Sequence, residues 1–184
     1  MNDDLIKASR NGNMKKITEL LDSGADSNYK NTKGDCALIE AFEKIKVVKL
    51  LLDRGANPNI QDRNGNTALL FATINNKTKV VELLLEIGAN PNIQDNVTGN
   101  TPLLEASKDG YGKIVGLLLS KGANPNIANK HGFTPMEAAT RGNHKSVIKM
   151  LKEAIQQYLA EGKKKRTLRK RKTLGKKKTL CKKK

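Results

Sequence analysis

The residues with the strongest chemical character in this sequence are cations near its C-terminus. Fourteen lysines and arginines lie between residues 163 and 184, and no aspartate or glutamate interrupts them. Closely spaced cations can neutralise a row of phosphates, so the chemistry they indicate is the binding of a polyanion. These residues are Lys163, Lys164, Lys165, Arg166, Arg169, Lys170, Arg171, Lys172, Lys176, Lys177, Lys178, Lys182, Lys183 and Lys184.

Four roles stay open for this polybasic segment. Basic clusters of this kind bind importin and direct nuclear import, bind the nucleic-acid backbone without sequence preference, or attach to anionic lipid. The fourth role is a solubilising segment with no dedicated partner. Because a run of like charges repels itself and cannot bury a core, we predict that residues 162–184 form a disordered basic tail.

Few other residues have types and spacing suited to chemistry. The two histidines, His131 and His144, have no metal-ligand spacing with the two cysteines, Cys36 and Cys181. No serine or cysteine has a recognisable base partner, and no Gly-rich phosphate loop is present. We therefore predict a non-enzymatic protein without catalytic residues, metal, cofactor or small-molecule substrate.

The charge balance outside the tail is nearly even. Of the 35 basic residues, the tail takes fourteen, which leaves 21 against 18 acidic residues in the rest of the chain. The two cysteines do not indicate a disulfide framework, which suggests a reducing compartment. The polar start of the sequence does not resemble a secretory signal. No apolar run reaches the roughly 20 residues that span a bilayer. The sequence thus predicts an intracellular protein, nuclear or cytoplasmic.

A tandem repeat must position whatever surface the protein uses. The pentapeptide Gly-Ala-Asn-Pro-Asn occurs at residues 55–59, 88–92 and 122–126, and a degenerate copy occupies residues 24–28. Successive copies start 31, 33 and 34 residues apart. A period near 33 indicates one supersecondary unit repeated in tandem. Stacked units provide long binding surfaces more often than active sites.

Each unit has the pattern of a turn, a short helix, a loop and a longer helix. In the unit that starts at residue 62, Asp62–Asn66 is a cluster of turn residues, and Thr67 suits a helix N-cap. Apolar residues follow at helical spacing. Gly88 then suits the left-handed position that ends a helix.

These residues resemble the ankyrin repeat family. Its pattern of Gly-x-Thr-Pro-Leu-His-x-Ala, then Val-Val-x-Leu-Leu, then Gly-Ala-(Asp/Asn)-x-Asn is matched in several copies over about residues 1–155. The resemblance implies an all-α repeat solenoid, an ankyrin stack of helix pairs joined by β-hairpin-like turns, over residues 1–161. We expect five units at about residues 1–30, 31–61, 62–94, 95–128 and 129–161, the last with a capping helix.

The sequence departs from the family pattern in three places. The family's His is replaced by Ile39, Leu70, Leu104 and Glu137, so we expect each unit to be less stable. The second unit lacks two residues between its helices, which predicts a shortened helix pair. The fourth unit has one extra residue within positions 95–99, which predicts a protruding loop.

The resemblance also implies where a protein partner binds, because the family uses the hairpin tips and the exposed side of each first helix. The tip positions are Lys33, Arg63, Asn64, Asn66, Val97, Asn100, Lys130, His131 and Phe133. The first-helix positions are Glu43, Ile74, Asn75, Lys108, Asp109 and Arg141.

Among these positions, Ile74 and Phe133 are apolar where solvent exposure is expected. They are either partner anchors or residues that pack locally against the next unit. Similar Asn- and Lys-rich ankyrin proteins of large DNA viruses and intracellular bacteria often act on host proteins. A protein-interaction module is therefore the expected function, with a nucleic-acid-associated protein as the alternative.

Overall fold

The computed structural model describes residues 1–160 of the 184-residue chain. The polybasic segment from Lys163 to Lys184, and every role predicted for it, lies outside the described residues.

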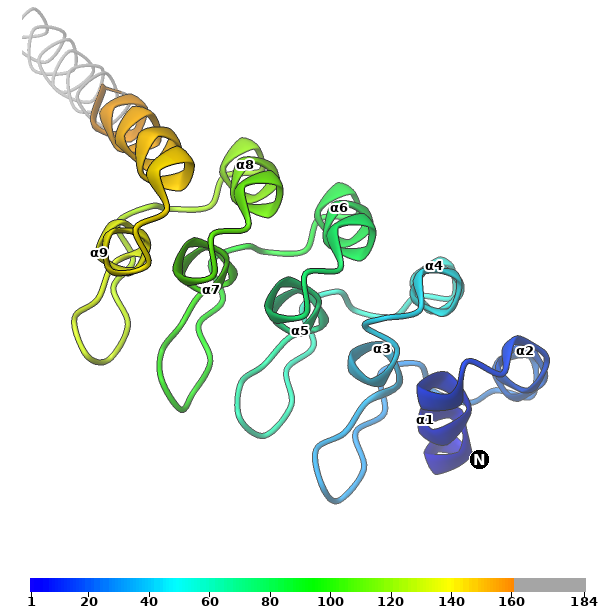
Figure 1. Ribbon diagram of the computed structural model, residues 1–184. Coiled ribbons are helices and arrows are strands. Elements are labelled where there is room, and N and C mark those ends of the chain that lie inside the picture. The colour runs from blue at the N-terminus through cyan, green and yellow to red at the C-terminus, as the bar shows by residue number, and fades with distance from the viewer. Residues whose placement is uncertain (161–184) are drawn as a thin grey trace, which may run out of the picture.

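The described residues form two parallel rows of helices, with hairpin loops projecting from one side of the first row (Figure 1). The first row is α1 (Asn2–Asn11), α3 (Ala37–Glu40), α5 (Ala68–Ile74), α7 (Pro102–Lys108) and α9 (Pro135–Arg141). The second row is α2 (Met14–Asp22), α4 (Ile45–Asp53), α6 (Thr78–Glu86), α8 (Gly112–Ser120) and the helical residues 145–160. The predicted all-α repeat solenoid is confirmed for this part of the chain.

Threonine N-caps start three of the first-row helices. The Thr67 hydroxyl accepts a hydrogen bond of 3.2 Å from the Leu70 amide, and Thr101 repeats this bond in α7. In α9 the Glu137 carboxylate also accepts from the Thr134 amide at 2.7 Å, which completes a capping box. The threonine N-cap therefore forms without the family's His, because the group that donates to the threonine hydroxyl is a backbone N–H of the same helix.

Left-handed glycines follow the second-row helices α2, α4, α6 and α8. Gly88 follows α6 with φ of 94°, and the next amide, that of Ala89, donates back to the Leu84 carbonyl at 2.9 Å. A side chain at this φ would be strained, so glycine is required here. The chain is thereby turned toward the next unit.

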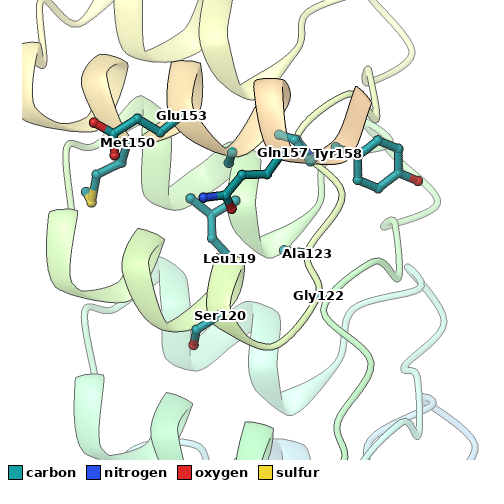
Figure 2. Close-up of a pocket in the computed structure, with 10 residues that line it drawn as sticks. Leu119, Ser120, Gly122, Ala123, Met150, Glu153, Gln157 and Tyr158 are labelled. Carbon is teal, nitrogen blue, oxygen red and sulfur yellow. The ribbon is translucent and has the colours of Figure 1, made fainter. Parts of the chain in front are cut away.

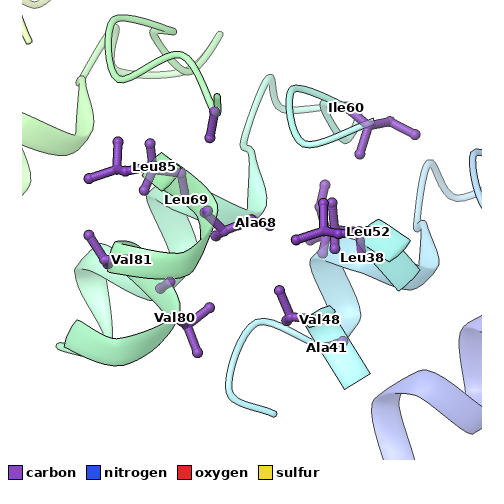
Figure 3. Close-up of a cluster of buried hydrophobic side chains, with 14 of the residues drawn as sticks. Leu38, Ala41, Val48, Leu52, Ile60, Ala68, Leu69, Val80, Val81 and Leu85 are labelled. Atoms are coloured by element: carbon purple, nitrogen blue, oxygen red, sulfur yellow. The ribbon is translucent and has the colours of Figure 1, made fainter. Parts of the chain in front are cut away.

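The core is a continuous seam of aliphatic side chains between the two rows. Figure 3 shows buried side chains on the helices of the second and third units, among them Val48, Leu69 and Val81. All three are at most 1 % exposed. None of the three phenylalanines of the chain belongs to the buried core. The low aromatic content therefore reflects a core built from Leu, Ile, Val and Ala.

The second unit is contracted in its first helix only. Helix α3 has four residues, whereas α5, α7 and α9 have seven each. Its N-cap, Cys36, makes no side-chain capping bond. Helix α4 has nine residues, like α6 and α8. The prediction of a shortened pair is right for α3 and wrong for α4, because the missing residues fall before α4 begins.

The hairpin loops are closed turns rather than paired strands. In the third unit the Asp62 amide donates to the Asn66 carbonyl at 2.9 Å, while the Asp62 carboxylate accepts from the amides of Asn64 and Asn66. Within residues 1–160 the one isolated β-bridge joins Lys30 and Cys36. The carboxylate or amide side chain at the start of each loop thus takes the place of the backbone hydrogen bonds that pair the two strands of a longer hairpin.

Consecutive hairpins stack closely on one another. A Cβ added to Gly65 would lie 2.7 Å from the backbone nitrogen of Asn96 in the next hairpin. The Asn96 amide in turn donates to the Asn64 carbonyl at 2.6 Å. Glycine is needed at this position for the close approach as well as for its φ of 78°.

Candidate binding surface

The hairpin loops and the exposed sides of the first-row helices lie on one side of the stack (Figure 1). We call this side the hairpin face and define it by loops 31–35, 62–66, 95–100 and 129–133 together with the outward residues of α3, α5, α7 and α9 and of the turns that follow them. It crosses four consecutive units, so a partner on it can contact residues far apart in the sequence.

Most residues predicted to bind a partner are exposed on the hairpin face. In the loops these are Lys33, Arg63, Asn64, Val97, Lys130 and His131, of which Val97 is 64 % exposed. At the first-row helices they are Glu43, Ile74, Asn75, Lys108, Asp109 and Arg141. Asn66 and Phe133 are half-buried.

Asn100 differs from the other predicted tip residues because it is buried. Its side-chain amide donates to the Glu105 carboxylate at 2.5 Å, and its side-chain carbonyl accepts from the Asn129 side-chain amide at 2.8 Å. The expectation that Asn100 lies at an exposed tip is wrong. The residue instead joins the hairpin of the fourth unit to helix α7 and to the hairpin of the fifth unit.

An apolar cluster occupies the middle of the hairpin face. The rings of Phe42 and Phe71 stack with centroids 5.6 Å apart and planes inclined by 29°. Ile74, three residues after Phe71 on the same side of α5, is 39 % exposed. The two phenylalanines are half-buried, so this cluster is covered only in part.

The sequence interpretation named Ile74 but missed both phenylalanines. Phe42 reaches the cluster because α3 ends at Glu40 and the chain turns there, with the Phe42 amide donating to the Ile39 carbonyl at 3.1 Å. Phe71 occupies the place in its unit that Glu40 and Glu105 hold in the neighbouring units. An aromatic residue between two units that carry glutamate at this place was the signal that could have revealed it.

The carboxylates beside the cluster already have partners within the chain. The Arg10 guanidinium lies 2.6 Å from the Glu40 carboxylate, and this hydrogen bond raises the pKa of Arg10. Glu43 pairs with Lys77 at 3.1 Å. Both pairs join one unit to the next across a solvated surface, where such a pair contributes about 0–1 kcal/mol.

The charged residues on the far side of the cluster also have partners within the chain. Lys108 lies 3.0 Å from Glu105, and the hydrogen bond between them raises the pKa of Lys108. In the last unit the Arg141 guanidinium lies over the Phe133 ring, 4.0 Å from its centroid. The structure therefore brings Phe133 and Arg141 together, with the ring covered by the cation.

This arrangement is suited to gripping an apolar side chain. The charges on each side of the Phe42–Phe71–Ile74 cluster are satisfied locally, so the uncovered apolar surface is the feature that a partner can complete. Within residues 1–160 no group of three or more His, Cys, Asp or Glu side chains is arranged to hold a metal ion. Over the same residues no helix combines the length and the apolar character needed to cross a membrane.

Comparison with known proteins adds one finding to this geometry. No curated protein matches the chain. A family model described as ankyrin repeats (3 copies) matches residues 5–95 and, a second time, residues 87–161. The two matches overlap and together span nearly all of the described stack.

Proposed function

Because this chain belongs to the ankyrin repeat family, we propose that it holds a partner protein on its hairpin face, with the Phe42–Phe71–Ile74 cluster as the main anchor. Ankyrin repeats mediate the binding of protein partners, and the family is generally a non-enzymatic interaction scaffold. The proposal concerns which residues of this chain make the contact.

One observation supports this choice of anchor more than any other. The chain has three phenylalanines, and it places two of them in contact and only half-buried on the hairpin face, with Phe71 packed against the edge of the core. Aromatic side chains that are partly exposed at the centre of a surface are typical binding hot spots. Truncating such a side chain to alanine costs about 2 kcal/mol or more of binding free energy.

The chemistry of the cluster also limits the partner. Glu40 and Glu105 flank Phe71 in the same column of the stack, but each already pairs with a cation. A charged partner residue would have to compete with Arg10 or Lys108 for them. The partner is therefore expected to insert a large apolar side chain, and to gain little from ion pairs at this point.

A matched pair of variants tests the proposal. Ile74 on the hairpin face is 39 % exposed, and Ile87, which follows the second-row helix α6, is 45 % exposed. In affinity capture from extract of the native host cell, followed by mass spectrometry, Ile74→Glu should lose a protein that wild type retains. Ile87→Glu, an equal change in charge and size, should retain it.

The partner identified in this way permits a quantitative test. Loss of a hot-spot contact predicts affinity at least about 30-fold weaker for Ile74→Glu in calorimetry. Phe71→Ala should give a similar loss. If the two isoleucine variants bind every captured protein equally, the cluster is not the anchor.

The hairpin tips are proposed to orient the partner around this anchor. Changing Arg63, Lys130 and Phe133 together to alanine should weaken the partner without lowering the melting temperature. A large loss of thermal stability would instead assign Phe133 to the packing of the last unit, since it already contacts Arg141.

The polybasic segment supports a second role, in nuclear targeting or polyanion binding. Its fourteen cations within 22 residues are the observation that favours it. If about six cations met phosphates, log K would fall with log salt at a slope of roughly −5.

Gel shifts of duplex DNA with the full chain and with a chain ending at residue 162 test polyanion binding. A shift at physiological salt that needs the segment would support a nucleic-acid-associated protein. Absence of that shift, together with nuclear accumulation of a fluorescent fusion that needs the same segment, would favour importin as the ligand.

A further inference from the structure

The repeated turns are joined to one another by a row of asparagine side chains, which we call the asparagine ladder. Asn28 accepts from the Asn57 amide at 2.7 Å and donates to the Gly55 carbonyl at 3.1 Å. Asn92 makes the same two bonds to Asn124 and Gly122, at 2.7 and 3.1 Å. Each rung thus recognises a backbone carbonyl and the amide two residues later.

The third rung has the same acceptor geometry. Asn59 accepts from the Asn90 amide at 2.7 Å. The residue at the centre of each recognised turn is an alanine, Ala56, Ala89 or Ala123, and all three are at most 6 % exposed. Each closed rung therefore fits three consecutive residues, of which the first offers its carbonyl, the second has a small buried side chain and the third offers its backbone N–H.

The two ends of the ladder differ. At the N-terminal end, Asn2 of helix α1 accepts from the Asp26 amide at 3.0 Å and so supplies the first rung. At the other end Asn126 is exposed, and no residue between 1 and 160 hydrogen-bonds to its side chain. The last rung is open in the described part of the chain.

The reason is that the last second-row helix does not end where its predecessors do. Helices α2, α4, α6 and α8 have nine residues each, whereas the helix that begins at residue 145 is still helical at residue 160. No fifth turn follows within the described residues to bind Asn126. The helix instead runs over the turn at residues 122–126.

A groove of about 510 Å³ lies between this helix and the turn. Leu119, Ala123 and Pro125 line it on the turn side, and Met150, Ala154 and Tyr158 line it on the helix side. Figure 2 shows the Gln157 side chain extending from the helix across the groove toward Leu119. The groove continues the turn-to-turn interface that joins every earlier pair of units.

We propose that this groove, together with the exposed Asn126 that follows Pro125 of its wall, binds a segment of a partner protein in the turn conformation of residues 122–124, whose backbone completes the open rung. The segment offers a carbonyl to the Asn126 amide and, two residues later, an N–H to the Asn126 carbonyl. Between them it carries a small side chain, as Ala123 does on the rung below. Gln157 is placed to bond the same backbone from the opposite wall.

A second copy of this chain is a poorer occupant. In head-to-tail stacking, Asn126 of one copy would meet the first turn of the next copy, residues 24–28. The Asp26 amide that it would need already donates to Asn2. The N-terminal end of the stack is closed, so the open rung has no matching surface on this chain's own first unit.

The site lies apart from the Phe42–Phe71–Ile74 cluster, and it requires nothing from the proposed function of the hairpin face. A peptide with the chain's own turn sequence, residues 120–128, is the probe. It is titrated into the ¹⁵N-labelled full chain and followed by the side-chain signals of Asn126 and Gln157 and the backbone signal of Ala123. The control peptide has the same residues in scrambled order.

The expected result is a saturable shift of these signals at peptide concentrations on the order of 1 mM, the range for a few hydrogen bonds and one apolar contact. Asn126→Ala should weaken the binding at least tenfold. Asn75→Ala, the same change on the hairpin face, should leave it unaltered.

Four outcomes would overturn the proposal. The first is no shift, and the second is an equal shift with the scrambled peptide or in Asn126→Ala. The third is a shift of the same signals on raising the protein concentration alone, which would assign the groove to a second copy. The fourth is a shift on removing residues 161–184, which would assign the groove to the chain's own C-terminal segment.

Discussion

The asparagine ladder predicts that two chemically identical substitutions have different effects on stability. Asn92→Ala removes two hydrogen bonds between the third and fourth turns, those to the Asn124 amide and the Gly122 carbonyl. Asn126→Ala removes the same side chain one turn later, where no residue of the described stack bonds to it. The pair therefore isolates the contribution of a closed rung.

The magnitude follows from the exposure of these bonds. A protein hydrogen bond contributes about 0.5–1.5 kcal/mol net, because water replaces it in the unfolded chain. The bond to Asn124 is part-buried and the bond to Gly122 is exposed, so their loss should cost about 1–2 kcal/mol in total. For a chain of this length, that corresponds to a fall of roughly 2–8 °C in melting temperature. Asn126→Ala should cost less than about 0.5 kcal/mol.

Urea unfolding and native-state hydrogen exchange together measure this difference. In a stack, each unit contacts only its neighbours, so the lost rung weakens one interface. Exchange should therefore accelerate mostly in α8 and in the amides of Ala123 and Asn124, while α5 stays protected. Equal destabilisation by the two variants, or exchange that accelerates evenly along the whole stack, would refute this account of the ladder.

Three further perturbations test other parts of the stack. Burial raises the pKa of Asp95, but hydrogen bonds from Thr98 and Asn100 outweigh it, so the pKa in the folded protein lies below the ordinary value of 3.8. The stabilisation of the fold by this shift is fully present above pH 3.8, and it is lost as the pH falls through the folded pKa. Asp95→Asn should therefore flatten the melting temperature against pH below about pH 4. Burial raises the pKa of the Cys36 thiol to about 11, so iodoacetamide at pH 8 should modify the Cys36 peptide far more slowly in native protein than in urea, by mass spectrometry. Cys36→Thr, which supplies the missing N-cap of α3, should raise the free energy of unfolding by about 0.5–1 kcal/mol in urea melts, and a loss would contradict the capping argument.

Local chemistry made much of the fold predictable from the sequence. Thr67, Thr101 and Thr134 start helices because a hydroxyl at an N-cap satisfies a backbone amide of the same turn. Gly88 ends a helix because its own φ of 94° suits only glycine without strain. The period of the turns indicated stacking before any contact between units was known.

The binding surface was less predictable, because its residues depend on contacts between units. Asn100 has the sequence position of a hairpin tip, yet Glu105 and Asn129 draw its side chain inward. Phe42 and Phe71 are 29 residues apart in the sequence, and they meet only because α3 is short and α5 packs beside it. Neither outcome can be read from one unit alone.

The sequence by itself determined the unit, its order of turn and helices, and the number of its turn motifs, since each rests on interactions within about 33 residues. The tertiary structure alone decided which side chains the units share. It joined two half-buried phenylalanines into one cluster, buried Asn100, and closed the asparagine ladder at Asn2 while leaving it open at Asn126. The physical reason is that a repeat defines its own backbone locally, whereas the use of its outward side chains depends on the neighbour that packs against it.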